Sequence, residues 1–153
     1  QVNPSDQPYY ESLVELAQKL GVTDQITYCG ALTRQEIALM NKACDISLLM
    51  YDVTNMGNVF HEMLSDGSAL VALNDGSLAQ FCENNMNCVL VEDEEDAAQA
   101  MIKILNQPEF QQHLREQAMI SSQQKMRTWQ ERVEDEVQLI ENAGMSHEKH
   151  NEK

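Results

Sequence analysis

The sequence has few basic residues and no long apolar run. Its 153 residues include 10 Lys and Arg against 25 Asp and Glu, which gives a formal net charge of −15. This shortage of positive charge argues against nucleic acid and anionic membrane surfaces as partners of this chain. No apolar run reaches the roughly 20 residues that a membrane-spanning helix needs. Hydrophobic residues still make up 42% of the chain, so the composition predicts a folded domain.

The cysteines and histidines do not have the spacing of a metal site. The four cysteines are Cys29, Cys44, Cys82 and Cys88, and no two of them form a C-x-x-C motif. The four histidines show no metal-ligand spacing with these cysteines. We expect buried free thiols in a reducing compartment, and a disulfide framework is the less favoured interpretation.

Apolar periodicity predicts an alternation of strands and helices. The expected strands are residues 25–29, 45–50, 69–73 and 88–91. The expected helices are residues 8–20, 33–43, 58–65 and 78–82, with three more starting near residues 93, 108 and 129. Thr33 and Glu36 have the spacing of a capping box. The pattern predicts one α/β domain over residues 1–144, a parallel sheet covered by helices on both faces, and a disordered polar tail at residues 145–153.

One loop carries the chemistry that the residues themselves suggest. Ligands of parallel sheets bind at the carboxyl ends of strands, and residues 50–58 follow the second expected strand. Gly57 lies where a helix begins, so free N–H groups and the helix dipole favour an anion such as phosphate there. Glu62, just over one turn further on, can accept two hydrogen bonds from a ribose diol. An ordinary strand-to-helix turn with Glu62 on a solvated face is the alternative, and spacing alone favours it. Neighbouring His61 points about 100° away from Glu62, which favours a packing or surface role.

The same segment resembles a known family signature. Residues 54–71 read T-N-M-G-N-V-F-H-E-M-L-S-D-G-S-A-L-V, and this is similar to E-G-F-G-x-x-x-x-E-A-x-x-x-G-x-P-V-V in the retaining "group 1" GT-B glycosyltransferases. Residues 75–91 resemble the V-G-G-x-P-E-V-V-x-D-G-x-x-G-x-L-V segment that follows in that family. Residues 20–30 resemble its upstream L-G-L-x-D-x-V-x-F-x-G segment. The ordered series, from about Tyr9 to Ala143, is more specific than any one motif.

The resemblance implies a fold and a role for the chain. The fold would be the Rossmann-like parallel sheet, sandwiched by helices, that forms the carboxyl-terminal half of a GT-B fold, with its N-terminal part truncated. The role would be to bind a UDP-, GDP- or ADP-sugar without a cofactor or metal, while a missing N-terminal domain binds the acceptor. The isolated chain would then be inactive and hold no catalytic residue. We also expect a cytoplasmic protein, which that missing domain could hold at the cytoplasmic face of a membrane, and self-association through the truncated sheet edge.

The resemblance also implies roles for single residues. Glu62 matches the glutamate that binds the nucleotide ribose, and Gly57 with Asn58 matches the helix start that meets the diphosphate. The positions that match the lining of the donor sugar are Thr54, Asn55 and Met56. The loop residues that match the wall against which the base stacks are Ala31 and Leu32.

Several positions depart from the family pattern. Thr54 replaces the first glutamate of the motif, and Ser77, Gln80, Asn85 and Cys88 replace a glycine, a glutamate and two glycines. Thr54 can still give one hydrogen bond but carries no charge. This departure favours a second interpretation, a degenerate glycosyltransferase-like module with a binding or scaffolding role.

Two further observations concern charged residues. The family's Arg…Lys pair has no counterpart here, because Lys19, Arg34 and Lys42 fall on expected helices.

An unrelated flavodoxin-like receiver is a third interpretation, but Asp52 and Asp75 are too isolated to form its aspartate cluster.

Overall fold

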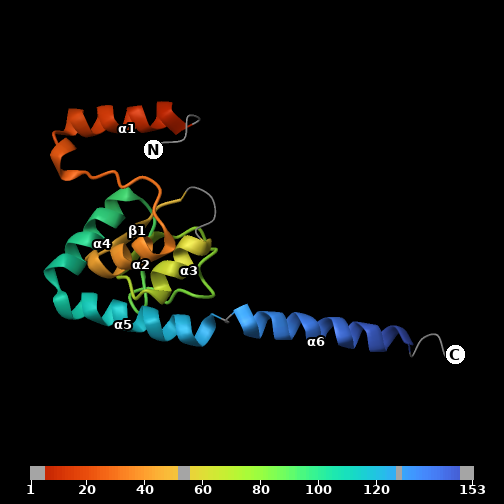
Figure 1. The fold of residues 1–153 in the computed structure, drawn as a ribbon. Coiled ribbons are helices and arrows are strands. Elements are labelled where there is room, and N and C mark those ends of the chain that lie inside the picture. The colour runs from red at the N-terminus through yellow and green to blue at the C-terminus, as the bar shows by residue number, and fades with distance from the viewer. Residues whose placement is uncertain (1–5, 52–55, 127–128, 149–153) are drawn as a thin grey trace. The chain divides into compact units, whose positions relative to one another are not determined.

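The fold of the chain is shown in Figure 1, a computed structural model that describes residues 6–51, 56–126 and 129–148. The chain divides into two compact units, Gln1–Leu39 and Met40–Lys153. The helices are α1 (Gln7–Leu20), the 3-10 helix η2 (Thr23–Gln25), α2 (Arg34–Ala43), α3 (Asn58–Ser65), α4 (Glu94–Asn106), α5 (Pro108–Lys125) and α6 (Trp129–Glu148). The strands are β1 (Ser47–Leu49), β2 (Leu70–Leu73) and β3 (Val89–Val91).

Local capping signals shape the first unit as the sequence predicts. Gly21 ends α1 in the left-handed conformation, with φ 69°, and its N–H donates to the Gln18 carbonyl at 3.1 Å. The capping box at the start of α2 forms, because the Thr33 N–H and hydroxyl both donate to Glu36 Oε2 at 2.7 Å. These bonds stabilise the carboxylate and lower the pKa of Glu36.

The expected strand at residues 25–29 is not present in the structure. Ile26 has extended backbone angles, φ −109° and ψ 127°, but the segment is not part of any sheet. A strand needs a neighbour that takes up its backbone hydrogen bonds, and residues 6–39 contain no other strand. Both of its large apolar side chains, Ile26 and Tyr28, stay more than half exposed. The prediction of a strand at residues 25–29 is therefore wrong, and Gln25 belongs to the 3-10 helix η2.

The second unit holds the parallel sheet that the sequence predicts. Among the described residues the sheet has three strands in the order β1-β2-β3, and both pairs are parallel. Leu49 of β1 pairs with Ala72 of β2, and Val71 of β2 pairs with Val89 of β3. Expected strands 45–50, 69–73 and 88–91 are thus confirmed, each slightly shorter than predicted.

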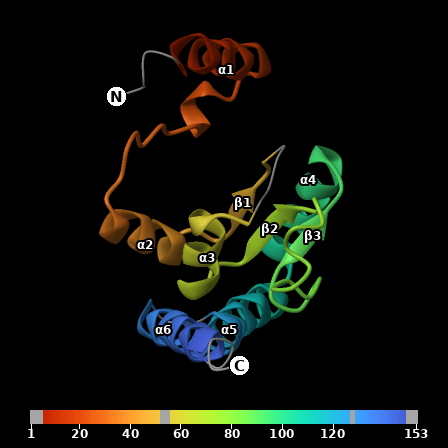
Figure 2. The same cartoon turned by 90° about the vertical axis from the view of Figure 1, so that its right-hand side faces the viewer.

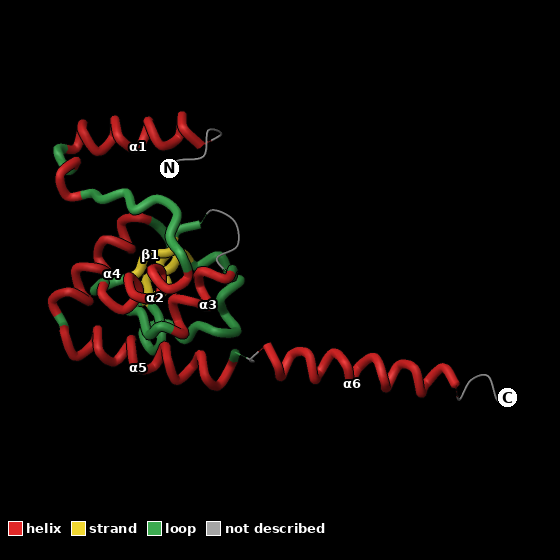
Figure 3. The backbone as a smooth tube through the Cα atoms, viewed as in Figure 1, coloured by secondary structure: helices red, strands yellow, loops and turns green. Residues whose placement is uncertain are grey.

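Helices cover both faces of this sheet, as Figures 2 and 3 show. One apolar cluster joins Leu49, Leu70 and Ala72 of the sheet to Phe60 and Leu64 of α3. The other cluster lies on the opposite face and packs strands β2 and β3 against α4 and the start of α5. A strand covered on both sides should be apolar throughout, and all of Leu70–Ala72 is fully buried. The predicted α/β fold with helices on both faces is confirmed.

The connection from α3 to β2 is fixed by a glycine. Gly67 has φ 73°, its N–H donates to the Leu64 carbonyl, and the next N–H, of Ser68, donates to the Met63 carbonyl. This pair of bonds is a Schellman motif. The position aligns with the last glycine of the family signature, which explains why a glycine is needed here.

Two predicted boundaries differ from the structure. Residues 78–82 form turns and not a helix, with the Phe81 and Cys82 N–H groups both bonded to the Leu78 carbonyl. Five residues are too few to nucleate a stable helix. At the other end, α6 continues to Glu148, past residue 145 where we placed the start of the tail, because extending a formed helix costs little. Residues 149–153 lie outside the described residues.

Candidate functional site

The carboxyl ends of β1, β2 and β3 meet at one edge of the sheet because the strands are parallel. Hydrogen bonds connect the segment that follows β2 to the end of β3. The Asn74 N–H donates to the Val91 carbonyl at 2.8 Å, and the Asn74 side-chain amide donates to Glu92 Oε1 at 2.8 Å. Further along, Asp75 Oδ1 accepts from both the N–H and the hydroxyl of Ser77. The loop after β2 is therefore held by its own polar side chains.

Helix α3 begins at this edge and presents an uncapped start. Gly57 precedes it in extended conformation, φ −117° and ψ −179°, and no side chain of the described residues caps the helix. The first turn contains no acidic residue. Any residue can adopt this backbone, so the conformation does not require glycine. What the glycine provides is space, because a Cβ built on Gly57 would have no neighbour within 4 Å.

Helix α4 begins at the same edge and differs in charge. Asp93 caps it, because its Oδ1 accepts from the Asp96 N–H at 2.9 Å. Glu94, Glu95 and Asp96 then supply three carboxylates in the first turn. These groups neutralise the positive end of the helix dipole. Of the two helices that start at this edge among the described residues, only α3 leaves its positive end without carboxylates of its own.

Glu62 lies on α3 as predicted. It follows Asn58 by four residues, which places the two side chains on one face of the helix. Glu62 is half-buried. Met56, Gly57, Asn58 and Glu62 are therefore brought together in one short stretch around the start of α3.

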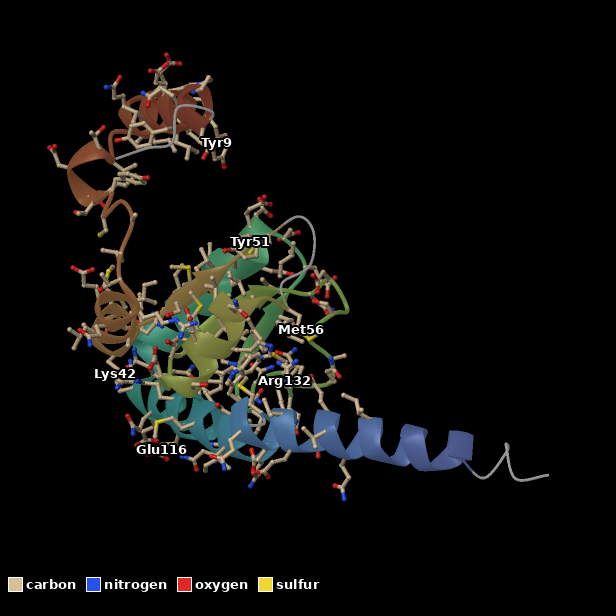
Figure 4. The ribbon with its side chains drawn as sticks, turned by 45° about the vertical axis from the view of Figure 1, so that its right-hand side comes forward. Tyr9, Lys42, Tyr51, Met56, Glu116 and Arg132 are labelled. Atoms are coloured by element: carbon tan, nitrogen blue, oxygen red, sulfur yellow. The ribbon has the colours of Figure 1, made fainter. Side chains whose placement is uncertain are left out.

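The structure does not place the other four predicted site residues at the start of α3. Thr54 and Asn55 lie outside the described residues. Figure 4 labels Tyr51 and Met56, which flank the gap. Ala31 and Leu32 belong to the first unit, where exposed Ala31 and half-buried Leu32 follow Gly30, which has φ 68°.

The turn after β2 supports α3 through contacts that sequence reasoning missed. The Gln80 side-chain amide donates to the Met56 sulfur at 3.1 Å, which links this turn to the segment before α3. Phe81 packs edge-on against Phe60 and His61, with ring centroids 6.2 and 5.2 Å away. No local pattern joins residues 24 positions apart. The only sequence signal was that Gln80 departs from the family motif.

His61 has the packing role that helical geometry favours. Its ring contacts Phe60 and Phe81, and its Nδ1 is buried without a hydrogen-bond partner among the described residues. Burial disfavours the charged imidazolium and lowers the pKa of His61. The side chain thus packs between two aromatic residues.

No group of three or more His, Cys, Asp or Glu side chains that could hold a metal ion occurs within residues 6–51, 56–126 and 129–148. No helix in the described part of the chain is long and apolar enough to cross a membrane.

Comparison with known proteins gives a family and several relatives. Residues 6–120 match the family described as "Glycosyl transferases group 1". The chain is 28% identical over 109 residues to alpha-monoglucosyldiacylglycerol synthase from Streptococcus pneumoniae, covering 71% of this chain and 25% of that protein. It is 27% identical over 92 residues to a GDP-mannose-dependent alpha-(1-6)-phosphatidylinositol monomannoside mannosyltransferase from Mycobacterium tuberculosis, covering 56% and 24%. The chain thus spans about a quarter of the length of these relatives.

Solved structures share the fold. Sucrose-phosphate synthase from Thermosynechococcus elongatus aligns with a TM-score of 0.81 at 20% identity, covering 95% of this chain and 36% of that chain. Anabaena HepE in complex with UDP aligns with a TM-score of 0.77 at 18% identity, covering 94% and 38%. The C-terminal domain of a glycosyl transferase group 1 family protein from Francisella tularensis aligns with a TM-score of 0.71 at 18% identity, covering 80% and 65%.

Proposed function

Because the chain belongs to the glycosyl transferases group 1 family, we propose that it forms the donor-binding part of a sugar transferase. The diphosphate of a nucleotide sugar lies at the start of α3, against Gly57 and the Asn58 N–H. The observation that carries this proposal is the start of α3 at the carboxyl edge of the sheet, which no side chain of the described residues caps, whereas the neighbouring helix α4 is capped and acidic. The UDP complex of a structural relative agrees with a nucleotide donor.

The chemistry of the site follows from its groups. The N–H groups at the start of α3 stabilise the negative charge of the diphosphate, both as bound donor and as the leaving group. The carboxylate of Glu62 accepts hydrogen bonds from the two ribose hydroxyls. Met56, with Thr54 and Asn55 beyond the described residues, lines the sugar. The roles of Ala31 and Leu32, which belong to the first unit, stay predictions from the family resemblance. In this proposal the site needs no metal or cofactor.

The acceptor, in this proposal, binds to a domain outside this chain. The chain spans about a quarter of its curated relatives, and one of its structural relatives is itself a C-terminal domain of a group 1 glycosyl transferase. The isolated chain is therefore proposed to bind donor without transferring sugar. The full protein is proposed to act in the cytoplasm.

Calorimetry with UDP, GDP and ADP tests the ribose contact. Glu62→Ala removes a charged acceptor of two hydroxyls, which is worth about 1.5–3 kcal/mol, or roughly a 10- to 150-fold loss of affinity. Glu116→Ala, on exposed α5 surface, is the matched control and should bind like the wild type. Equal affinity of Glu62→Ala and wild type would rule out the ribose role of Glu62.

A degenerate binding or scaffolding module is the second candidate. Thr54 in place of the motif glutamate favours it, because the hydroxyl cannot supply a negative charge beside the sugar. Both candidates predict nucleotide binding, so binding does not separate them. Turnover or nucleotide-sugar hydrolysis by the full-length protein supports the enzyme, and binding without either supports the module.

Self-association through β1 is part of the proposal. Within the described residues β1 pairs only with β2, so its other edge has no strand partner. Leu48 on this strand is 46% exposed. Residues 45–50 contain no Lys or Pro that would hinder pairing with a strand of another chain. Sedimentation should show a concentration-dependent dimer that Leu48→Lys dissociates. A monomer at all concentrations contradicts this part of the proposal.

A further inference from the structure

Two buried cysteines lie beside the turn that supports α3. Cys82 ends this turn and is 6% exposed, and Cys88 directly precedes β3 and is fully buried. Both are free thiols in the apolar cluster that also contains Phe60 of α3. The other two cysteines, Cys29 and Cys44, are exposed, so the prediction of buried thiols holds for one pair only.

The two thiols lie in the same apolar cluster. The Asn87 side chain bonds to the residues on both sides of Cys82, and Cys88 directly follows Asn87 in the chain. The neighbouring Cys82 thiol and burial raise the pKa of Cys88 far above that of an ordinary thiol, while the positive charge of Lys125 acts in the opposite direction. In the closed fold, burial therefore protects both thiols.

The backbone between the two cysteines closes on itself. The Asn85 N–H donates to the Cys88 carbonyl at 2.8 Å, and Asn85 takes the left-handed conformation, with φ 62°. The buried Asn87 amide accepts from the Glu83 N–H and donates to the Phe81 carbonyl, both at 2.8 Å. These bonds hold the two ends of residues 82–88 together without any metal or covalent link.

We propose that Cys82 and Cys88 form a redox-active dithiol, which a low-molecular-weight disulfide oxidises to an intramolecular disulfide. The Cys82 thiolate, formed when the turn opens, attacks one sulfur of the small disulfide and releases one small thiol. The Cys88 thiolate then attacks the Cys82 sulfur of the mixed disulfide and releases the second. Two protein thiols lose two electrons and two protons, and one small disulfide becomes two small thiols. Cys82 reacts first because it is the more exposed of the two.

The modification has a structural consequence at the site. Phe81 adjoins Cys82 and packs on Phe60 and His61 of α3. A disulfide between Cys82 and Cys88 joins this turn to the start of β3. It therefore restricts the movement of Phe81, which packs against α3. The disulfide itself does not depend on nucleotide binding, so the two proposals can fail separately.

Peptide mapping after oxidation tests the proposal. The folded chain is incubated with oxidised glutathione, alkylated and cleaved after glutamate. Cleavage after Glu83 places Cys82 and Cys88 on different peptides, which stay joined only by the disulfide. We expect one linked species that dithiothreitol separates. The overturning result is no such species from the folded chain under conditions where the urea-unfolded chain gives it.

Variants establish the order of attack. All are made in a Cys29→Ser/Cys44→Ser background, which removes thiols that the proposal does not use. Cys88→Ser should accumulate a stable glutathione adduct on Cys82, about tenfold faster than Cys82→Ser accumulates one on Cys88. Equal rates overturn the assignment of Cys82 as the first nucleophile. If either variant unfolds, the linked peptide of the unsubstituted chain still decides the proposal.

Discussion

An aspartate at position 57 should stabilise the fold and weaken nucleotide binding. Gly57 has an extended backbone, φ −117° and ψ −179°, as does Asp93, the residue that caps α4, with φ −156° and ψ −175°. An aspartate would fit, because a Cβ on Gly57 meets nothing within 4 Å. Its carboxylate would then accept from the N–H three residues on, that of Phe60, as Asp93 does in α4.

The two effects have opposite signs. The new cap adds a few tenths of a kcal/mol relative to glycine, and the negative charge at the helix start adds about 0.3–1 kcal/mol, so the free energy of unfolding rises by roughly 0.5–1 kcal/mol. The same carboxylate occupies the N–H groups proposed for the diphosphate and repels it. Loss of one hydrogen bond to a charged group alone costs about 1.5–3 kcal/mol, or roughly a 10- to 150-fold loss of affinity.

Urea unfolding and calorimetry with UDP on the same preparation measure both quantities. Gly57→Asn is the matched control, because it caps the helix without the charge and should lose less affinity than Gly57→Asp. Unchanged UDP affinity in Gly57→Asp, with increased stability, would refute the reasoning. The start of α3 would then be an ordinary strand-to-helix turn.

Three further predictions concern stability. Gly67→Ala should cost about 2–4 kcal/mol, because φ is 73° and the new Cβ meets the Met119 sulfur at 2.7 Å; Gly76→Ala, with φ 78° and open space, should cost only about 1–2 kcal/mol in urea unfolding. Equal losses would show that Met119 yields freely. Arg115→Ala removes two bonds to carbonyls near the end of α2, at 2.9 and 3.0 Å, and should lower the free energy of unfolding by about 1–2 kcal/mol; wild-type stability would contradict this. The pKa of His61 is lowered, so the unfolded chain binds its proton at higher pH than the folded chain, and stability should fall as pH drops below 6.5. Urea titrations at several pH values should show a weaker dependence in His61→Leu, and an identical dependence would exclude this role.

The sheet of the second unit was predictable because its signals are local. Residues 69–73 are apolar without a break, and such a run is typical of a strand covered on both faces. Residues 25–29 carry an equally good strand pattern, yet the structure leaves them outside any sheet. Sequence determines that a segment is extended, but pairing depends on whether a neighbour exists.

The candidate site also has a part that local sequence spacing predicts and a part that depends on long-range contacts. Gly57, Asn58 and Glu62 lie within six residues, so helical spacing alone places them together. The contact between Met56 and Gln80 joins two loops that only the folded sheet brings together. The placement of Cys82 and Cys88 in one apolar cluster also depends on the turn around residues 78–82, where the sequence pattern predicts a helix.

Two departures from the family motif have a structural explanation in their loops. Asn85 replaces a glycine and keeps a left-handed turn, with φ 62°, which asparagine tolerates better than most residues. Ser77 replaces another glycine, and its N–H and hydroxyl both bond to Asp75, so the loop after β2 gains a side-chain tie. A site built from main-chain N–H groups depends on this geometry more than on side-chain identity. Thr54 is different, because there the family motif has a charged side chain. The proposed anion binding at α3 and the proposed contact with the sugar are therefore separable predictions. A variant such as Thr54→Glu should change the second without changing affinity for UDP.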